Sequence, residues 1–400
     1  MNRRSFVTAS AAGLTAQTAF SYQRILGAND RIRTGVIGAG GRGRFVTGEF
    51  KEIGAEMAAV CDVYEPNLEA GLKAASTGAK PYGNYKRLLE DKSLDAVLIT
   101  TPDHWHAQMT VDAVESGKDV YVEKPLAHTI AEGFRMIEAT RRTKRIVQVG
   151  TQRRSAPLFM ESQQIARSGE LGAVRLVNSW WYNNQASINT APVDGKLDWE
   201  QWLGTSPKRA FDPARFRNWY YYWDYSGGLM IGQAAHIVDA IHWYMGSDAP
   251  LAVTTSGGRV NIEGVEIPET TCMNIEYPQN YLAVFTVGYK AMHYNAFNDQ
   301  CKQFHGDKAR LDVGREWYSL YPQSNAIDMK PSREKRAPGS FNSATRDHIR
   351  NFLECVRSRK EPNAPVEAGQ STNIVLCMAI ESLRTGRRMK WNSVARRAEA

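Results

Sequence analysis

The 400-residue sequence predicts an α/β protein of two domains, the first built on a parallel sheet and the second on a large, mostly antiparallel open sheet. Two observations support this fold class. Over residues 31–152, short apolar strands alternate with helical stretches, a pattern typical of a parallel sheet covered on both faces. Over residues 153–390, longer strand candidates follow one another with turn signals between them, which indicates antiparallel pairing.

The first domain is expected to contain five strands, separated by helical stretches. The strands are TGVIG (34–38), EMAAVC (56–61), AVLITT (96–101), DVYVEK (119–124) and IVQVGT (146–151). The first helical stretch is RFVTGEFKEIG (44–54), which directly follows a glycine-rich segment. This arrangement of strand, glycines and helix is the one in which nucleotide-binding turns occur.

The second domain is expected to contain long strands and two notable helices. The strands are VRLVNSWWY (174–182), LAVTTSGG (251–258), TTCMNIEY (270–277), YLAVFTVGY (281–289) and KQFHGDKARLDV (302–313). One helix is expected from Gly228 to Met245, and a second, amphipathic one over residues 371–386, which we expect to pack back on the first domain. The segment 322–342 is rich in proline, serine and charge and predicts a surface loop.

The glycine-rich segment GVIGAGGRG (35–43) predicts a dinucleotide-binding turn of the Rossmann type. Gly38 permits the tight turn, Gly40 lets the backbone approach a pyrophosphate, and Gly43 lets helix and strand pack closely. The diphosphate would then bind at the free amides of the helix N-terminus. The turn contributes five expected cofactor-binding residues, Gly38, Gly40, Gly41, Arg42 and Gly43.

Asp62 lies at the end of the second predicted strand, about 20 residues after the glycine motif. An acidic residue at this distance accepts hydrogen bonds from the ribose hydroxyls of NAD and repels the additional phosphate of NADP. An isolated glycine motif could equally serve an ordinary loop. With strand, helix and acid all in place, the sequence favours NAD binding, with NADP less favoured.

Composition and residue spacing give no support for nucleic-acid binding, a membrane span or a metal site. The formal charge is +8, but the basic residues are not clustered with aromatic residues in a nucleic-acid module, so no nucleic-acid partner is expected. No apolar run reaches the roughly 18 residues that indicate a membrane span. The five cysteines form no CxxC pair and the eight histidines no metal-binding spacing, so we predict no metal.

The N-terminal segment MNRRSFVTASAAGLTAQTAF resembles a twin-arginine export signal. Arg3 and Arg4 precede a mildly apolar stretch rich in alanine and threonine. We therefore expect residues 1–28 to be a signal peptide read by the twin-arginine machinery, and the protein to be periplasmic. The alternative is a frayed tail with two adjacent arginines. Cleavage near Ala19 and near Ala28 both remain open.

Aromatic residues are concentrated between residues 178 and 225. They are Trp180, Trp181, Trp199, Trp202, Trp219, Tyr220, Tyr221, Tyr222, Trp223 and Tyr225. Aromatic faces pack on the C–H faces of sugar rings, which supports a small carbohydrate substrate. Packing of these side chains under a long loop explains them equally well.

The sequence resembles the glucose–fructose oxidoreductase / inositol dehydrogenase / MocA family. The resemblance covers roughly residues 31–390, and DWEQWLG and WDYSGG are similar to its exported branch. It is carried by GVIGAGGRG (35–43), Asp62, TTPDHWHA (100–107), VEKP (122–125), GTQRR (150–154) and AAHIVD (234–239). It implies a Rossmann domain followed by an α/β domain whose open sheet often forms the interface of a homodimer or homotetramer.

The resemblance also implies roles for single residues. The implied catalytic residues are Lys124 and His236. Beyond the glycine turn and Asp62, the implied cofactor-binding residues are Thr101, Pro102, His106, Glu123, Lys124 and Gln152. The implied substrate-binding residues are Lys124, Arg153, Tyr222, His236 and Asp239. The sequence departs from the family pattern at Gly232, where an aspartate is expected four residues before the histidine.

Three functions follow from this resemblance. The first is an NAD-dependent oxidoreductase that acts on a hydroxyl of a sugar, polyol or glycoside by hydride transfer to tightly bound NAD. The second is an NAD-dependent glycoside hydrolase that works through a transient 3-keto intermediate. In that branch the lysine is typically replaced, so the retained Lys124 favours the dehydrogenase. The third is a non-catalytic sugar-binding protein that keeps its cofactor, for which Gly232 is the best argument.

Overall fold

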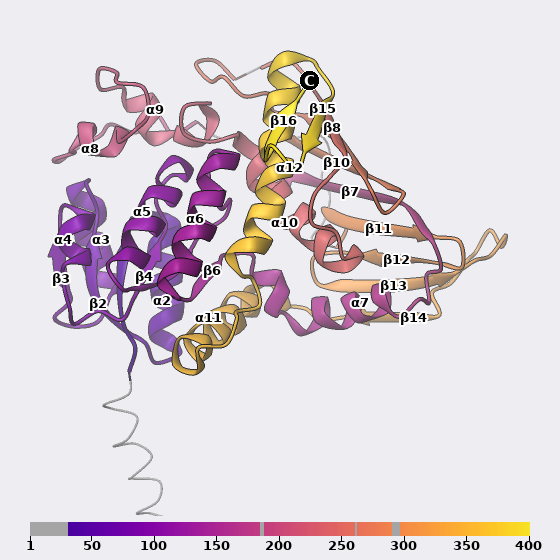
Figure 1. Ribbon diagram of the computed structural model, residues 1–400, viewed down its shortest axis with the longest axis horizontal. Helices are drawn as coiled ribbons and strands as arrows, with labels where there is room; N and C mark the ends of the chain where they lie inside the picture. The colour runs from indigo at the N-terminus through magenta and orange to yellow at the C-terminus, as the bar shows by residue number, and fades with distance from the viewer. Residues whose placement is uncertain (1–30, 185–187, 261, 290–296) are drawn as a thin grey trace, which may run out of the picture.

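The computed structural model describes residues 31–184, 188–260, 262–289 and 297–400. The leader expected at residues 1–28 lies outside this part of the chain. Among the described residues, no helix combines the length and apolar character that a membrane crossing requires. The molecule has two sheets, with helices between them and around the first (Figure 1).

The first sheet has six parallel strands in the order β3-β2-β1-β4-β5-β6, which confirms the predicted parallel sheet. The strands are β1 (Arg33–Ile37), β2 (Glu56–Cys61), β3 (Lys80–Tyr82), β4 (Ala96–Ile99), β5 (Asp119–Val122) and β6 (Val147–Val149). The helices are α2 (Gly41–Glu52), α3 (Glu65–Ala74), α4 (Tyr85–Leu89), α5 (Asp103–Glu115) and α6 (Ile130–Thr143). The strand order reverses between β1 and β4, where ligands of such sheets bind beyond the carboxyl ends of the strands.

The second sheet has ten strands in the order β14-β13-β12-β11-β7-β10-β9-β8-β15-β16. Neighbours are antiparallel except β7 and β10, which run parallel, so the sheet is mostly antiparallel as predicted. The strands are β7 (Val174–Asn184), β8 (Ala252–Gly257), β9 (Thr271–Tyr277), β10 (Tyr281–Tyr289), β11 (Gln300–Gly306), β12 (Ala309–Val313), β13 (Trp317–Pro322), β14 (Arg333–Arg336), β15 (Met389–Asn392) and β16 (Arg397–Glu399).

Two predictions about this sheet need correction. The single strand expected over 302–313 is a hairpin of β11 and β12, because the chain turns sharply after Gly306. The segment 322–342, expected to be a loop, contains β14 and the first residues of a helix. All four residues of β14 are charged and exposed, so they carry no apolar signal.

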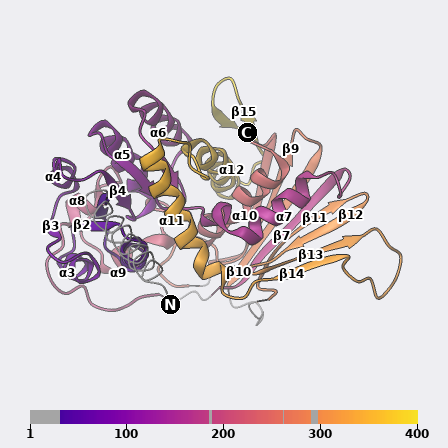
Figure 2. The same cartoon turned by 90° about the horizontal axis from the view of Figure 1, so that it is seen from below.

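The helices of the second domain are η1 (Gln152–Ser155), α7 (Pro157–Arg167), α8 (Trp199–Leu203), α9 (Pro213–Arg217), η2 (Trp219–Tyr221), α10 (Gly228–Met245), α11 (Ser340–Ser358) and α12 (Val366–Thr385). Most of them lie on one face of the second sheet or between the two domains, whereas α8 and α9 lie beside the first domain (Figure 2). The bounds of α10 are those predicted, and nearly all its residues are buried. α10 packs under the sheet, α11 packs on α2, and α12 contacts both α6 and α10.

Residues 188–226, here called the cap segment, cross over the carboxyl ends of the first sheet (Figure 1). The Asp198 amide donates to the Val63 carbonyl at 3.0 Å, and the Trp105 indole Nε1 donates to the Trp202 carbonyl at 2.7 Å. A cluster of buried, mostly aromatic residues holds the segment in place. Its buried members are Tyr64, Trp202, Leu203, Phe216, Tyr222 and Tyr225. The cap segment therefore covers the crevice at the switch point.

Candidate functional site

The glycine-rich turn between β1 and α2 lies at the crevice. Gly38 has a φ of +90°, and a Cβ there would lie 2.9 Å from the backbone of Thr100. A Cβ on Gly43 would lie 2.1 Å from the Gly38 carbonyl oxygen, so only glycine allows helix and strand to approach this closely. Gly40 and Gly41 face open space, with nothing within 4 Å of a Cβ on either. The turn thus leaves room for a diphosphate at the amides of the α2 N-terminus.

Asp62 directly follows β2 and lies beside this turn. Its Oδ2 accepts from the Ala39 amide at 2.7 Å, and its Oδ1 accepts from the Tyr64 amide at 2.9 Å. Burial raises the pKa of Asp62, and the two amide hydrogen bonds oppose this shift. Each carboxylate oxygen still has a lone pair for a ribose hydroxyl.

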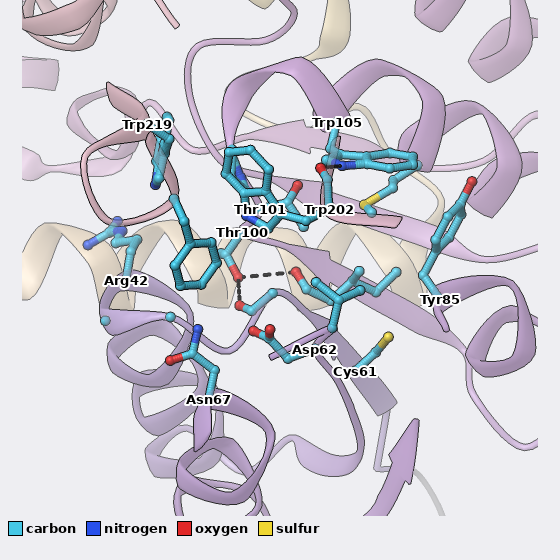
Figure 3. A pocket seen from close by; sticks show the side chains of 18 of the residues that line it. Arg42, Cys61, Asp62, Asn67, Tyr85, Thr100, Thr101, Trp105, Trp202 and Trp219 are labelled. Carbon is cyan, nitrogen blue, oxygen red and sulfur yellow. Dashed lines mark hydrogen bonds between the residues drawn. The ribbon is translucent and has the colours of Figure 1, made fainter. Parts of the chain in front are cut away.

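A cavity of about 420 Å³ lies next to the turn (Figure 3). Most residues predicted to bind the cofactor line it, namely Gly38, Gly40, Gly41, Arg42, Asp62, Thr101 and Pro102. The sequence did not single out Asn67, Tyr85 and Trp105, which also line the cavity. The cap segment contributes Trp202 and Trp219. Aromatic walls opposite a carboxylate suit a nucleotide, whose base stacks and whose ribose hydroxyls donate hydrogen bonds.

An ion pair between Arg42 and the buried Glu123 connects the glycine turn to the turn that follows β5. Arg42 Nε and Nη2 each lie 2.7 Å from Glu123 Oε1. Burial raises the pKa of Glu123, but the positive charges of Arg42 and Lys124 outweigh this effect and hold the pKa below its usual range. Glu123 is therefore an ionised carboxylate that fixes Arg42 at the edge of the cavity.

His106 connects the cavity to the same turn. Its Nε2 lies 3.0 Å from the Thr101 carbonyl oxygen, and its Nδ1 lies 2.7 Å from the Pro125 carbonyl oxygen. The side chain is buried, at 1% exposure. His106 thus holds two backbone turns together, and both ring nitrogens already have partners.

Lys124 follows β5 and extends toward α10. Its Nζ donates to the Gly232 carbonyl at 3.1 Å. Burial lowers the pKa of Lys124, and the nearby carboxylates of Glu123 and Asp103 oppose this shift. Asp103 is itself buried and accepts from Ser226 Oγ at 2.6 Å. Sequence reasoning did not single out Asp103, although it lies within the TTPDHWHA motif.

His236 lies on α10, one turn after Gly232. Its ring centre is 5.9 Å from that of Trp181, and its Nδ1 is buried with no hydrogen-bond partner among the described residues. Burial lowers the pKa of His236 well below its usual value, and the positive charges of Lys124 and Arg153 act in the same direction. The imidazole is therefore neutral near pH 7 and able to accept a proton.

Asp239 and Arg153 are both predicted to bind the substrate, but they differ in how many of their polar atoms already form hydrogen bonds within the protein. Both carboxylate oxygens of Asp239 accept from Arg154 Nε at 2.9 Å, inside the protein. Arg153 Nη2 donates to Gln300 Oε1, while Arg153 Nε and Nη1 have no partner within the described part of the chain. Arg153 thus retains donors for a ligand, whereas Asp239 serves as the counterion of Arg154. Gln300, on β11, was not predicted.

The structure places Tyr222 in the aromatic packing of the cap segment. Its hydroxyl donates to the Gly264 carbonyl at 2.7 Å, and the Arg215 guanidinium lies 4.3 Å from its ring centre. These contacts give it a packing role and do not support the expected substrate contact. Tyr220, two residues earlier, lies against Gly232 on α10. Gln152 begins η1 and is buried, and its Oε1 has no partner among the described residues.

Comparison with known proteins places this geometry in a family. Residues 32–151 match the model of an oxidoreductase family with an NAD-binding Rossmann fold, GFO_IDH_MocA. Residues 199–391 match the model of the C-terminal alpha/beta domain of that family. The first match covers all six strands of the first sheet, and the second covers β8 to β14 of the second sheet.

Curated relatives match about a third of this chain or less. Inositol 2-dehydrogenase of Salmonella typhimurium is 38% identical over 131 residues, which are 32% of this chain and 39% of that protein. The alpha-N-acetylgalactosaminidase of Shewanella oneidensis is 35% identical over 123 residues, which are 28% of this chain and 27% of that protein. The matched segment thus spans about two fifths or less of the length of these relatives.

Among solved structures, the fold is similar to that of myo-inositol dehydrogenase from Lactobacillus casei in complex with NAD(H) and myo-inositol. The TM-score is 0.68 at 20% identity, and the match covers 90% of this chain and 97% of that one. This likeness extends over both domains. With both family models matched in order along the sequence, the chain belongs to the Gfo/Idh/MocA family of NAD-binding oxidoreductases.

Proposed function

We propose that the protein is an NAD-dependent oxidoreductase that oxidises a hydroxyl group of a sugar, polyol or glycoside. The observation that carries this proposal is that the Lys124 side chain reaches α10 one turn away from His236. Lys124 bonds to the carbonyl of Gly232, and His236 follows on the next turn of the helix. This cluster adjoins the cofactor cavity through Arg42, which lines the cavity and pairs with Glu123.

His236 and Lys124 have different roles in the proposed oxidation. Neutral His236 accepts the proton of the substrate hydroxyl, because burial keeps its imidazole unprotonated. The Lys124 side chain stabilises the negative charge that develops on the oxygen. When bound, NAD accepts the hydride from the carbinol carbon. The O–H and C–H bonds break, the C=O bond forms, and the proton is left on His236.

The open glycine turn and Asp62 fit NAD as the cofactor. Gly40 and Gly41 leave space for the diphosphate, and the Asp62 carboxylate can accept bonds from the ribose hydroxyls. A 2′-phosphate beside this carboxylate would be repelled. Arg44 also lines the cavity, but its Nη1 already donates to the Ala39 carbonyl at 2.7 Å. We therefore propose a preference for NAD over NADP.

The test is a panel of sugars, polyols and aryl glycosides incubated with the purified protein. Reduction of NAD together with formation of a ketone or lactone supports the dehydrogenase. Release of aglycone without net change in the cofactor supports the glycosidase. Binding of sugars with neither reaction would support a non-catalytic sugar-binding protein.

The glycosidase remains a second candidate because of one comparison. The Shewanella oneidensis relative is named as an alpha-N-acetylgalactosaminidase, and its match lies within 28% of this chain. An oxidation that precedes elimination of an aglycone would use the same Lys124 and His236. Product analysis on one glycoside separates the two outcomes, since the dehydrogenase leaves a keto product with its glycosidic bond intact, whereas the glycosidase releases the aglycone.

We also propose that the protein is exported to the periplasm by the twin-arginine route. The support is the sequence of residues 1–28, in which Arg3 and Arg4 precede a mildly apolar stretch. The test is to fuse this segment to a reporter and to compare it with Arg3→Lys/Arg4→Lys. Export of the reporter should require both arginines, and equal export of the two fusions would contradict the proposal.

We further propose that the open sheet forms a homodimer or homotetramer. The helices α7, α10 and α12 cover one face of this sheet. Residues directed to the other face remain exposed in part, for example Leu282 of β10, at 38% exposure, and its partner Leu176 of β7. Leu282→Glu should shift the mass measured by light scattering to that of a monomer. An unchanged mass would exclude this face as the interface.

A further inference from the structure

Gly232 and Tyr220 occupy complementary space at the center of the proposed site. A Cβ on Gly232 would lie 1.8 Å from the Tyr220 hydroxyl oxygen and 2.7 Å from Cζ of the same ring. No side chain can therefore project from position 232 while Tyr220 keeps its place. The phenol of Tyr220, which comes from η2 of the cap segment, thus occupies the space that the side chain of the expected aspartate would fill.

The phenol lies against the turn of α10 that Lys124 also contacts. The Gly232 carbonyl accepts the hydrogen bond from Lys124 Nζ, and His236 is one turn further along α10. The Asp103 carboxylate acts electrostatically on both Tyr220 and Lys124. Tyr220 has ring contacts with Trp219 and Tyr221, but its hydroxyl has no hydrogen-bond partner among the described residues. The hydroxyl is therefore available to a ligand.

The protonation state of this phenol limits what it can do. Burial raises the pKa of Tyr220 well above its usual value, and the charge of Asp103 acts in the same direction. The hydroxyl keeps its proton throughout the physiological range, so it can donate a hydrogen bond but cannot serve as a base. An aspartate at position 232 would have been an anionic acceptor, so the replacement changes the chemistry of the position.

We propose that Tyr220 is a catalytic residue that donates a hydrogen bond to the reacting oxygen of the substrate, in the space left by the aspartate that Gly232 lacks. This inference rests on the proposed oxidation of a hydroxyl group. The substrate proton goes to His236 and the hydride to NAD, while Tyr220 keeps its own proton and, with Lys124, stabilises the developing negative charge. Donors of this kind act on the transition state more than on substrate binding.

The first test is Tyr220→Phe, which removes the hydroxyl and keeps the ring. We expect kcat on the best substrate to fall by about 100-fold, as for the loss of one oxyanion donor. The dissociation constant for NAD and the melting temperature should change little. The matched control is Tyr222→Phe, which removes the hydroxyl that donates to Gly264, so kcat should stay near the wild-type value. Wild-type kcat in Tyr220→Phe would overturn the proposal.

The second test uses the steric relation between the two positions. Gly232→Asp alone should be poorly folded, because its Cβ would collide with the phenol. In Tyr220→Ala, the space is free, and adding Gly232→Asn should return a hydrogen-bond donor to it, because the amide of asparagine donates whereas the carboxylate of aspartate only accepts. We expect Tyr220→Ala/Gly232→Asn to exceed Tyr220→Ala in kcat by at least about 10-fold, whereas Tyr220→Ala/Gly232→Ala should not. Equal kcat in both double variants would overturn the proposal.

The outcomes also separate this inference from the function on which it rests. A wild-type protein that binds NAD but oxidises no member of the panel would refute the proposed function, and the catalytic role of Tyr220 with it. A wild-type enzyme that is active and insensitive to Tyr220→Phe would refute only the inference.

Discussion

Lys124, His236 and Asp103 share a buried environment, and burial opposes the charged form of each group. Burial lowers the pKa values of Lys124 and His236 and raises that of Asp103. For Lys124, the carboxylates of Glu123 and Asp103 oppose the effect of burial. His236 has no such partner, and nearby positive charges add to its shift. The arrangement therefore supplies a neutral base next to a lysine whose charge is supported by two carboxylates.

Lys124→Met tests the role of this lysine, because methionine keeps much of the side-chain volume and removes the charge. We expect kcat to fall by about 100-fold or more, the scale of losing one charge-stabilising donor. The melting temperature should stay close to that of the wild type.

The matched control for Lys124→Met is Lys118→Met. Lys118 is also buried, and its Nζ donates to the carbonyls of Asp91 and Leu94, at 2.8 and 2.7 Å. The Lys118→Met substitution should lower the melting temperature and leave kcat per folded molecule unchanged. A Lys124→Met protein that is unstable, or that has full activity, would exclude a catalytic role.

Asp62→Ser tests the preference for NAD. The wild-type protein should bind NAD more tightly than NADP in calorimetric titrations, because the carboxylate accepts from the ribose hydroxyls and repels a 2′-phosphate. The variant should lose most of this preference. Equal or tighter binding of NADP by the wild type would contradict the assignment.

At the scale of single residues, the sequence indicated the residues at the cofactor cavity more fully than the residues around Lys124 and His236. Gly38, Gly43 and Asp62 could be placed because a local motif fixes their positions. Gly232 was recognised as a departure, but Tyr220 could not be paired with it, because the contact joins the cap segment to α10. Contacts of this kind depend on tertiary packing, which no local pattern encodes.

Among secondary-structure elements, too, those with a strong local sequence signal were predicted, and those without one were not. α10 has the predicted bounds because a long apolar run is flanked by glycines at both ends. β3 was missed because its three residues contain a proline and are largely exposed. The cap segment was noted for its aromatic residues, but only the structure shows that Trp202 and Tyr225 pack against the first domain.

α11 is held to the first domain by a histidine that the mechanism does not use. His348 Nε2 lies 2.8 Å from the Val149 carbonyl oxygen, and its Nδ1 lies 2.7 Å from Ser155 Oγ. Burial lowers the pKa of His348 to about 4. Because the folded pKa is below the unfolded value of about 6.5, the unfolded state takes up the proton first as the pH falls. The contribution of this group to stability is present above pH 6.5 and is lost toward pH 4.

His348→Gln should therefore weaken the pH dependence of stability. Between pH 7 and pH 5, the free energy of unfolding of the wild type should fall, with about 2 kcal/mol of the loss due to His348. Urea titrations at the two pH values should show a loss smaller by about that amount in His348→Gln. The control is Ser155→Ala, which removes the partner of Nδ1 but no titratable group. Identical losses in wild type and His348→Gln would contradict the assignment.

At the scale of the whole molecule, the cofactor cavity lies between two parts of the chain that are far apart in sequence. The glycine turn and Asp62 form one wall, and Trp202, Phe216 and Trp219 of the cap segment contribute to the other. The cap segment is tied to the first domain by backbone hydrogen bonds and by buried aromatic residues. A dinucleotide in this cavity would contact both parts of the chain.

The proposed export of the folded protein leads to a prediction about the purified protein. The periplasm holds no pool of free NAD, so a protein exported in the folded state would have to carry its cofactor and keep it through many turnovers. A nanomolar dissociation constant corresponds to roughly 12 kcal/mol of binding free energy. Each reduction of such a cofactor must then be reversed within the site, by a second carbonyl substrate or in a redox-neutral cycle. We therefore expect the exported, dialysed protein to contain dinucleotide and to need little or no added NAD.

Denaturation of that protein, followed by chromatography of the supernatant, measures the bound dinucleotide directly. The matched control is Gly41→Asp, in which the new carboxylate has room, since nothing lies within 4 Å of a Cβ at this position. The variant should fold and yet release no dinucleotide, because the added negative charge repels the diphosphate at the N-terminus of α2. If the wild type also releases none and depends strictly on added NAD, then the cofactor exchanges freely. In that case, either the export of the folded protein or the signal assigned to residues 1–28 is wrong, because a freely exchanging cofactor could not be replaced outside the cytoplasm.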